Sequence, residues 1–289
     1  MKYALALAGT LALALPALAQ DNGVDPAELA RITAEHPAWA TWLADPALAK
    51  LTLAGPKMPN SPWRADDIRR PQPPHVDTAK ACAAQPPGDA DVLFDGHDLS
   101  KWTGAHVEEW TVKDGELTTG AHIYNFLQTK QAYGDAQIHV EFREPQQPSP
   151  PVNPQYRGNS GVFPMGLYEL QILDSYSTDT YPDGMVGAIY SQTPPLVNAS
   201  RPAGVWQCYD IVFHAPHFSG NSLSPARMTV MLNGVLVQDN TALIGATVHA
   251  KVGVYTPHAA ELPLSLQDHG NKESHVSFRN IWVRRLNPG

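Results

Sequence analysis

Short apolar and aromatic runs separated by turn-forming residues dominate the sequence over residues 91–286. Gly, Asn, Asp and Pro stand between the runs, and two of the gaps carry Asp114-Gly115 and Asn233-Gly234, dipeptides that favour tight β-hairpin turns. Many short strands with such turns, and no helical periods between them, are typical of a β-sandwich or barrel. The runs lie at residues 110–112, 137–142, 168–173, 209–213, 228–232, 235–238, 251–255 and 275–283. We therefore predict one all-β domain over residues 91–289.

Three of these runs alternate between apolar and polar residues. Over residues 137–143, Ile138, Val140 and Phe142 would share one face of a strand and His139 and Glu141 the other. Residues 168–173 and 264–269 alternate in the same way, with polar rows formed by Glu169 and Gln171 and by Ser265, Gln267 and His269. A polar row faces either solvent or a cleft. Because three strands share acid, amide and imidazole groups, we favour a cleft for a ligand rich in hydroxyls, such as a sugar.

The first residues have the pattern of an export signal. Lys2 precedes an apolar run that closes on small residues at 17–19, so residues 1–20 are predicted to be a cleaved signal peptide. The protein is therefore expected to be periplasmic or secreted, with no membrane span after cleavage. A formal net charge of −8 without any basic block argues against nucleic acid and anionic membranes as partners.

Residues 21–90 are predicted to form a helical and Pro-rich extension. Two short helices are expected over residues 25–49, and an extended segment over 63–88, where five prolines prevent regular structure. The extension either lies against the β domain or is free of it. Cys82 and Cys208 would mature in an oxidising compartment, and the sequence leaves open whether they pair.

Seven motifs occur in the order found in one known family. They occupy residues 93–102 (LFDGHDLSKW), 110–117 (WTVKDGEL), 158–163 (GNSGVF), 168–174 (YELQILD), 187–190 (GAIY), 266–270 (LQDHG) and 276–284 (VSFRNIWVR). In these motifs the chain resembles the 3-keto-disaccharide hydrolase family. The resemblance implies a concanavalin-like jelly-roll sandwich of two antiparallel sheets with a concave face for saccharide. It also implies action on glycosides whose C3 hydroxyl is already a ketone, by elimination across C1 and C2 or by hydration of the resulting enone.

Such a reaction needs a base for the C2 proton, a donor or cation for the enolate, and a proton source. Glu169 is predicted to be the base or a metal ligand, the alternative being an ion pair with Arg279 or Arg143. His269 is predicted to transfer a proton or bind a metal, the alternative being a hydrogen bond to a loop. A divalent cation, Ca²⁺ or Mg²⁺ rather than zinc, would suit the chemistry, although no ligand motif of fixed spacing is present.

The remaining candidates would bind or position the sugar. They are Asn159, Ser160, Gln171, Tyr190, Gln267, Arg279, Glu141 and His139. Asp174 and Asp268 have the opposite strand parity and are expected to be structural. The tryptophans Trp102, Trp110 and Trp206 are expected in the core rather than as sugar platforms.

Three other functions remain open at this point. A jelly roll serves equally well as a non-catalytic carbohydrate-binding module. An ordinary glycosidase on this fold would need acids at alternate positions of one strand, and the chain has no Glu-x-Asp-x-x-Glu run. A structural protein of an envelope assembly could use the N-terminal helices for docking.

Overall fold

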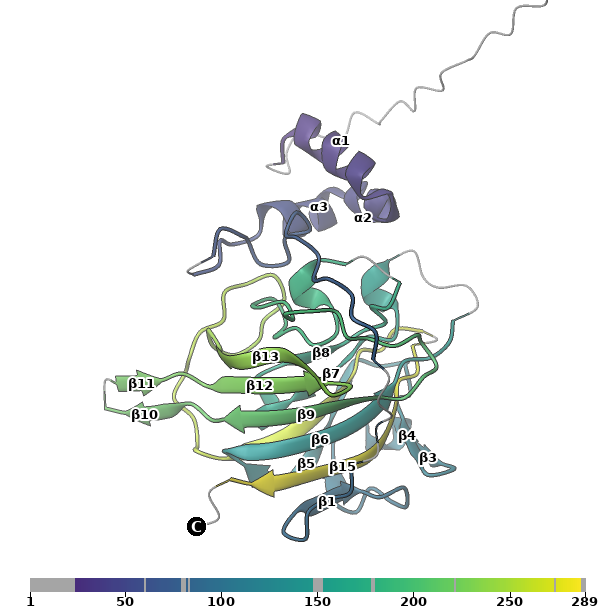
Figure 1. Cartoon of the computed structure of the whole chain (residues 1–289), viewed down its shortest axis with the longest axis vertical. Coiled ribbons are helices and arrows are strands. Elements are labelled where there is room, and N and C mark those ends of the chain that lie inside the picture. The colour runs from purple at the N-terminus through teal and green to yellow at the C-terminus, as the bar shows by residue number, and fades with distance from the viewer. Residues whose placement is uncertain are drawn as a thin grey trace, which may run out of the picture.

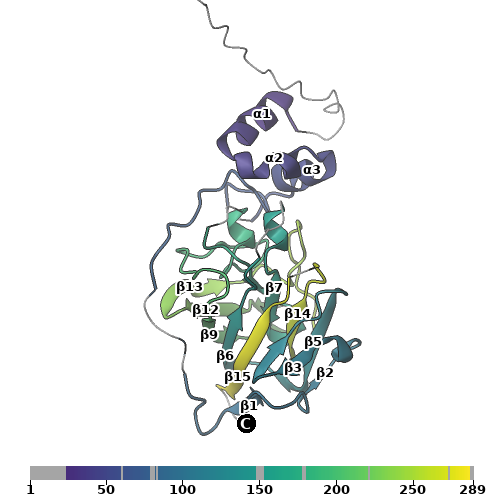
Figure 2. The ribbon, with the colours of Figure 1, turned by 90° about the vertical axis from the view of Figure 1, so that its right-hand side faces the viewer.

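The computed structural model describes residues 24–59, 61–78, 82, 84–147, 153–177, 180–220, 222–272 and 274–286. The predicted signal peptide, residues 1–20, lies outside this part of the chain. Two antiparallel sheets pack face to face, and a group of short helices sits at one end of them (Figures 1 and 2). The predicted all-β jelly-roll sandwich with a helical extension is confirmed. No helix in the described ranges is long and apolar enough to cross a membrane.

The larger sheet has eight strands. Their order is β13 (Val235–Ala242), β12 (Arg227–Leu232), β9 (Gln207–His214), β6 (Ala136–Arg143), β15 (Ser277–Arg285), β4 (Glu116–Thr118) and β3 (Thr111–Lys113), with β1 (Asp91–Phe94) paired to β15. The two predicted hairpin turns connect β3 to β4 and β12 to β13. Both central residues of each turn have positive φ, at 51° and 80° for Asp114 and Gly115 and at 53° and 82° for Asn233 and Gly234. Asn, Asp and Gly tolerate this left-handed backbone, which matches the twist of paired strands.

The smaller sheet has five strands, in the order β2 (Trp102–Thr103), β5 (Asn125–Tyr133), β14 (Leu262–Asp268), β7 (Ser160–Phe163) and β8 (Leu170–Ile172). A ribbon of β10 (His217–Ser219) and β11 (Ser222–Ser224) projects at the side (Figure 1). Single 3₁₀ turns lie at Val107–Glu109, Pro154–Tyr156, Pro164–Gly166 and Pro182–Gly184.

Apolar residues from both sheets form the core between them. Val140 and Phe142 of the larger sheet and Leu170 and Leu266 of the smaller one are all fully buried. These are the apolar members of the alternating runs, so the predicted strand parity is confirmed. Consequently the polar residues of β8 and β14 face away from the core, on the outer side of the five-stranded sheet.

The extension begins with three short helices where two were expected. They are α1 (Pro26–Glu35), α2 (Ala40–Leu43) and α3 (Pro46–Ala54), with a 3₁₀ turn at Pro37–Trp39. Asp25 and Asp45 cap α1 and α3 by accepting backbone N–H bonds, and each is followed by a proline. The helices pack on the β domain through Trp39, whose ring lies 6.1 Å from that of Tyr181. The extension therefore lies against the domain.

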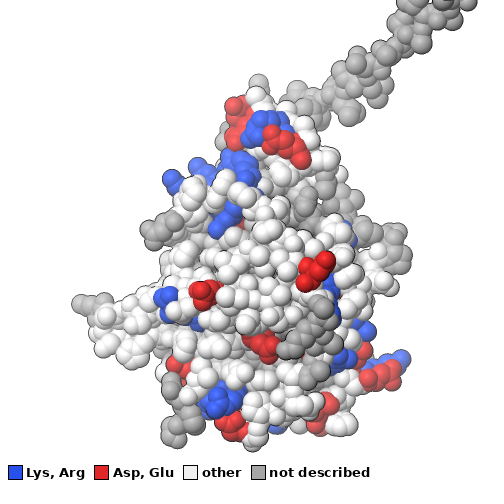
Figure 3. Space-filling view, viewed as in Figure 1, with Lys and Arg blue, Asp and Glu red and all other residues white. Residues whose placement is uncertain are grey.

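The proline-rich segment follows the side of the sandwich from the helices towards β1 (Figure 2). Its attachments to the sandwich include a hydrogen bond from Val76 N–H to the Asn198 carbonyl, a disulfide between Cys82 and Cys208 of β9, and a hydrogen bond from Asn280 of β15 to the Ala84 carbonyl. The pairing that the sequence left open is thus present. In the space-filling view, acidic and basic side chains lie together on the helices, while the middle of this face is mostly uncharged (Figure 3).

Candidate active site

A pocket of about 500 Å³ lies on the outer side of the five-stranded sheet. Four strand residues form its floor: Phe126 of β5, Phe163 of β7, Gln171 of β8 and Gln267 of β14. Each is adjacent in its strand to a residue of the core, so its own side chain lies on the opposite face of the sheet. Strand parity therefore determines which side chains face the pocket. The other lining residues are Trp42, Leu48, Tyr124, Gln155, Tyr156, Asn159, Gly166, Leu167, Glu169, Tyr181, Tyr190, Thr247, His249 and His269.

Two of these residues, Trp42 of α2 and Leu48 of α3, come from the extension. The helices therefore form one wall of the pocket. The sequence left open whether the residues before 91 are a separate extension or part of the cleft wall, because neither helix carries a motif that indicates where it packs.

Glu169 lies immediately before β8, where its backbone N–H donates to Thr247 Oγ1 at 2.9 Å. Its side chain is buried beside Gly161 of β7, and a Cβ at Gly161 would lie only 2.8 Å from Glu169 Oε1. Glycine is thus required for the carboxyl to lie at this depth. Burial, with a smaller contribution from Asp66, raises the pKa of Glu169 well above its usual range. Neither arginine considered from the sequence pairs with it: Arg279 binds Glu141 and Arg143 binds Glu116.

His269 follows the end of β14 and lies between two tyrosines. Its ring centre is 5.7 Å from that of Tyr124 and 6.5 Å from that of Tyr156. Burial lowers the pKa of His269, which favours the neutral imidazole. Within the described residues its Nδ1 atom is buried without a hydrogen-bond partner.

A second histidine of the pocket, His249, was missed from the sequence. It lies in the long segment between β13 and β14, where no alternation or motif marks it. Its ring is 6.0 Å from that of Tyr190, whose hydroxyl is 2.8 Å from the Tyr181 hydroxyl. Burial lowers the pKa of His249 and raises that of Tyr190. The pocket therefore combines a carboxyl whose pKa is raised, imidazoles whose pKa values are lowered and phenols whose pKa is raised.

Several buried polar atoms around the pocket have no partner within the described chain. They are Gln155 Oε1, Asn159 Oδ1, Gln267 Oε1 and His269 Nδ1. Native structures rarely leave buried polar atoms unpaired, so such a group indicates a place for water or a polar ligand. Hydroxyl groups can donate to the amide oxygens and also accept, as a sugar requires.

The predicted binding residues on this side of the molecule differ in what they offer. Gln171 Oε1 accepts from the Ile172 N–H at 3.0 Å, which leaves its amide N–H groups for a ligand. Ser160 adjoins the pocket but does not line it, because its hydroxyl donates to the Gln267 carbonyl at 2.6 Å. Asp174 and Asp268 are structural as expected: Asp174 pairs with Arg157, and Asp268 accepts from backbone N–H groups of Ala121 and Gly270.

The structure places the other three predicted sugar contacts elsewhere. His139, Glu141 and Arg279 lie on β6 and β15, on the outer face of the eight-stranded sheet. Glu141 accepts from Arg279 Nε at 2.7 Å and from Asn280 Nδ2 at 2.9 Å. The expectation that these residues share a cleft with Glu169 is therefore wrong, because identical parity on two opposed sheets directs side chains to opposite sides of the molecule.

His139 is also committed to structural contacts on that face. It pairs with Asp210 at 2.6 Å and stacks on Trp282 at 5.2 Å between ring centres. Of the three tryptophans expected in the core, Trp102 and Trp110 are buried, whereas Trp206 lies partly exposed beneath the guanidinium groups of Arg143 and Arg279.

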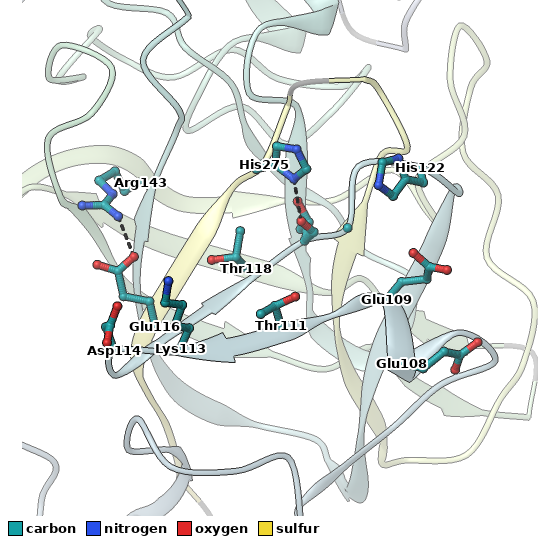
Figure 4. A pocket seen from close by; sticks show the side chains of 12 residues that line it. Glu108, Glu109, Thr111, Lys113, Asp114, Glu116, Thr118, His122, Arg143 and His275 are labelled. Atoms are coloured by element: carbon teal, nitrogen blue, oxygen red, sulfur yellow. Dashed lines mark hydrogen bonds and ion pairs between the residues drawn. The ribbon is translucent and has the colours of Figure 1, made fainter.

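A wider hollow of about 690 Å³ lies over the β3–β4 hairpin (Figure 4). In Figure 4 its charged groups surround an open surface, with Glu116 paired to Arg143 and His275 bonded to the Thr119 carbonyl. None of its lining residues has a buried, unpaired side-chain atom. It also contains none of the predicted catalytic residues, so we do not assign it a catalytic role.

The family match and a similar solved structure, together with a pocket of carboxyl, amide, imidazole and aromatic groups, place the chain among carbohydrate-active proteins. The chain belongs to the family of 3-keto-alpha-glucoside-1,2-lyase-like domains, whose model matches residues 89–284. The resemblance seen in the sequence motifs is thereby confirmed. Trp42, Leu48 and Asp66 belong to the extension and lie before residue 89, where the match begins.

Solved structures from Parabacteroides distasonis, each described as a "putative glycosyl hydrolase", share the fold. One is 41% identical, covers 69% of this chain and 84% of its own, and superposes with a TM-score of 0.64. A second, at 20% identity, covers 68% and 99% with a TM-score of 0.51, and this degree of identity supports the fold alone. A comparison with curated proteins found no match.

Proposed function

We propose that the protein cleaves 3-keto-glycosides at the C1–oxygen bond by elimination, followed by hydration of the enone. A ketone at C3 makes the C2 hydrogen acidic, so a modest base can remove it. The electron pair of the C2–H bond first forms an enolate. It then returns to form the C1=C2 bond as the C1 oxygen leaves with a proton from an acid. Water added across C1=C2, with hydroxyl at C1 and hydrogen at C2, gives the free 3-keto sugar.

One observation carries this assignment: in a single pocket the pKa of a carboxyl is raised while the pKa values of two imidazoles are lowered. Groups whose pKa values are displaced in this way suit opposite roles in acid–base chemistry. Because burial raises the pKa of Glu169 well above its usual range, we propose it as the acid for the leaving oxygen rather than the base expected from the sequence. A neutral imidazole, that of His269 or His249, takes the C2 proton.

Phenol and amide groups would hold the enolate oxygen. The Tyr181 and Tyr190 hydroxyls share one hydrogen bond, in which one of them donates, so the hydroxyl hydrogen of the other can be offered to a ligand. Gln267 Nε2 lies 3.3 Å from the Tyr124 hydroxyl, which then has its own hydrogen to donate. Donors already in place for a developing oxyanion lower the barrier without reorganisation during the reaction.

A divalent cation, Ca²⁺ or Mg²⁺, stays a proposal for this pocket. The described residues contain no group of three or more His, Cys, Asp or Glu side chains placed to hold a metal ion. The acid–base steps proposed here use side chains of this chain alone, and the assay below tests dependence on Ca²⁺ or Mg²⁺. Export to the periplasm or the medium is likewise proposed, and the Cys82–Cys208 disulfide supports an oxidising compartment.

The test uses a chromogenic aryl 3-keto-glucoside and the matching aryl glucoside with an intact C3 hydroxyl. We expect phenol release from the ketone only, with solvent deuterium at C2 of the hydrated product. Ca²⁺, Mg²⁺, Mn²⁺, Zn²⁺ and a chelator are supplied in separate arms. Release from the unoxidised glucoside would instead identify an ordinary glycosidase. Binding without product in every arm would identify a carbohydrate-binding module, and either result would refute the proposal.

A further inference from the structure

The extension places one fully buried carboxyl, that of Asp66, behind the pocket wall. Its backbone lies in the left-handed region, with φ of 57°, and its N–H donates to Asp183 Oδ2 at 3.2 Å. The Ser191 hydroxyl donates to Asp66 Oδ1 at 2.7 Å. One contact holds the backbone of Asp66 and the other holds its side chain, so together they fix the orientation of the carboxyl.

The second carboxyl oxygen of Asp66 is directed at a pocket residue. Asp66 Oδ2 lies 3.4 Å from His249 Nε2 and, within the described residues, has no hydrogen bond. The Ser191 hydroxyl also accepts from the Ala250 N–H at 3.3 Å, so one hydroxyl holds both the carboxyl and the segment that carries His249. A catalytic hydrogen bond is often this long in an unliganded protein and tightens when substrate binds.

We infer that Asp66 is a positioning residue that orients His249 as the base, so that the N-terminal extension completes the active site. When substrate binds, Nε2–H of His249 donates to Asp66 Oδ2, which leaves Nδ1 as the acceptor for the C2 proton. The carboxylate then stabilises the imidazolium that forms. His269 forms no ion pair with a carboxylate in the described residues, and Asp268 acts on it only through its charge. The assignment of His249 as base rests on the proposed function, whereas the Asp66–His249 contact does not.

The charges around the pair set its pH dependence. Asp66 faces the carboxyls of Asp183 and Glu169, the imidazole of His249 and the phenols of Tyr181 and Tyr190. Arg70 pairs with Asp183, and His249 also faces His269. Burial raises the pKa of Asp66 to about 7 and that of Asp183 to about 8. The pair can accept the C2 proton when Asp66 is ionised and His249 is neutral. The fraction of protein in this form increases as pH rises through about 7, the pKa of Asp66.

The decisive variant is Asp66→Asn in the full mature chain, and the matched control is Asp67→Asn. Asp67 is the adjacent buried carboxylate, but it pairs with Arg69 at 2.7 Å and does not contact His249. Two readouts are used: kcat and KM on the aryl 3-keto-glucoside, and the pH titration of the His249 ring by NMR.

In Asp66→Asn we expect kcat to fall on the order of 100-fold or more with a much smaller change in KM, because orientation of the base matters in the transition state. The His249 titration should also change, whereas Asp67→Asn should keep both properties. If Asp66→Asn does not fold, Ser191→Ala, which frees the same carboxyl, should shift the His249 titration.

An unchanged His249 titration in the folded Asp66 variant, or in Ser191→Ala if that variant is needed, would overturn the inference whatever the substrate. So would an equal loss of kcat in Asp67→Asn. Absence of turnover by the wild type would refute the proposed function instead, and the NMR titration would still decide whether Asp66 controls His249.

Discussion

Replacing Gly161 by alanine should displace the proposed acid without altering its chemistry. The new Cβ would lie 2.8 Å from Glu169 Oε1 and 2.7 Å from Phe163 Cε2, where ordinary contacts begin at 3.4 Å. The carboxyl must therefore move by about 0.6 Å. Because a misplacement of about 1 Å costs on the order of 100-fold in rate, we expect kcat to fall about 10-fold. Overpacking should also cost about 1–3 kcal/mol of unfolding free energy.

The assay compares kcat and KM on the aryl 3-keto-glucoside with the urea unfolding of the same preparation. Gly88→Ala is the matched control, because a Cβ at Gly88 would meet nothing within 4 Å. It should leave both properties unchanged. A stable, folded Gly161→Ala protein with wild-type kcat would refute the reasoning, since the position of the Glu169 carboxyl would then not matter.

Two further predictions concern pH and the disulfide. The kcat of the wild type should decrease as pH falls, because Asp66 and the imidazole base become protonated. It should also decrease as pH rises through the raised pKa of Glu169, because the acid loses its proton. Glu169→Gln should remove the alkaline decrease, and a wild-type profile that stays flat on that side would argue against Glu169 as acid. The double variant Cys82→Ser, Cys208→Ser should lose up to about 5 kcal/mol in urea unfolding, because the bond closes a loop of sequence separation 126. An unchanged urea midpoint would show that the disulfide does not constrain the unfolded chain.

The sequence was most informative where local rules decide the structure. Alternation over residues 168–173 and 264–269 correctly predicted which side chains lie in the core and which on the opposite face. Asp-Gly and Asn-Gly marked the two hairpins, because few other residue pairs adopt positive φ twice in succession. The motifs also predicted the family, which the match over residues 89–284 confirms.

Parity did not predict which polar face forms the pocket. His139 and Glu141 alternate with apolar residues just as Gln171 and Gln267 do, yet the first pair lies on the eight-stranded sheet and only the second pair lines the pocket. Period-two alternation records that one face of a strand is apolar. It carries no information on which segment later covers the other face.

The sequence by itself therefore determined the sandwich, its turns, its core positions and its family. Only the tertiary structure decided that Trp42 and His249 line the pocket, that Asp66 contacts His249 from behind the wall and that Cys82 meets Cys208. The physical reason is range: strand parity and turn geometry depend on adjacent residues, whereas these contacts depend on how separate segments pack. Asp66 and His249 lie 183 positions apart in the chain, and no local pattern reports such a distance.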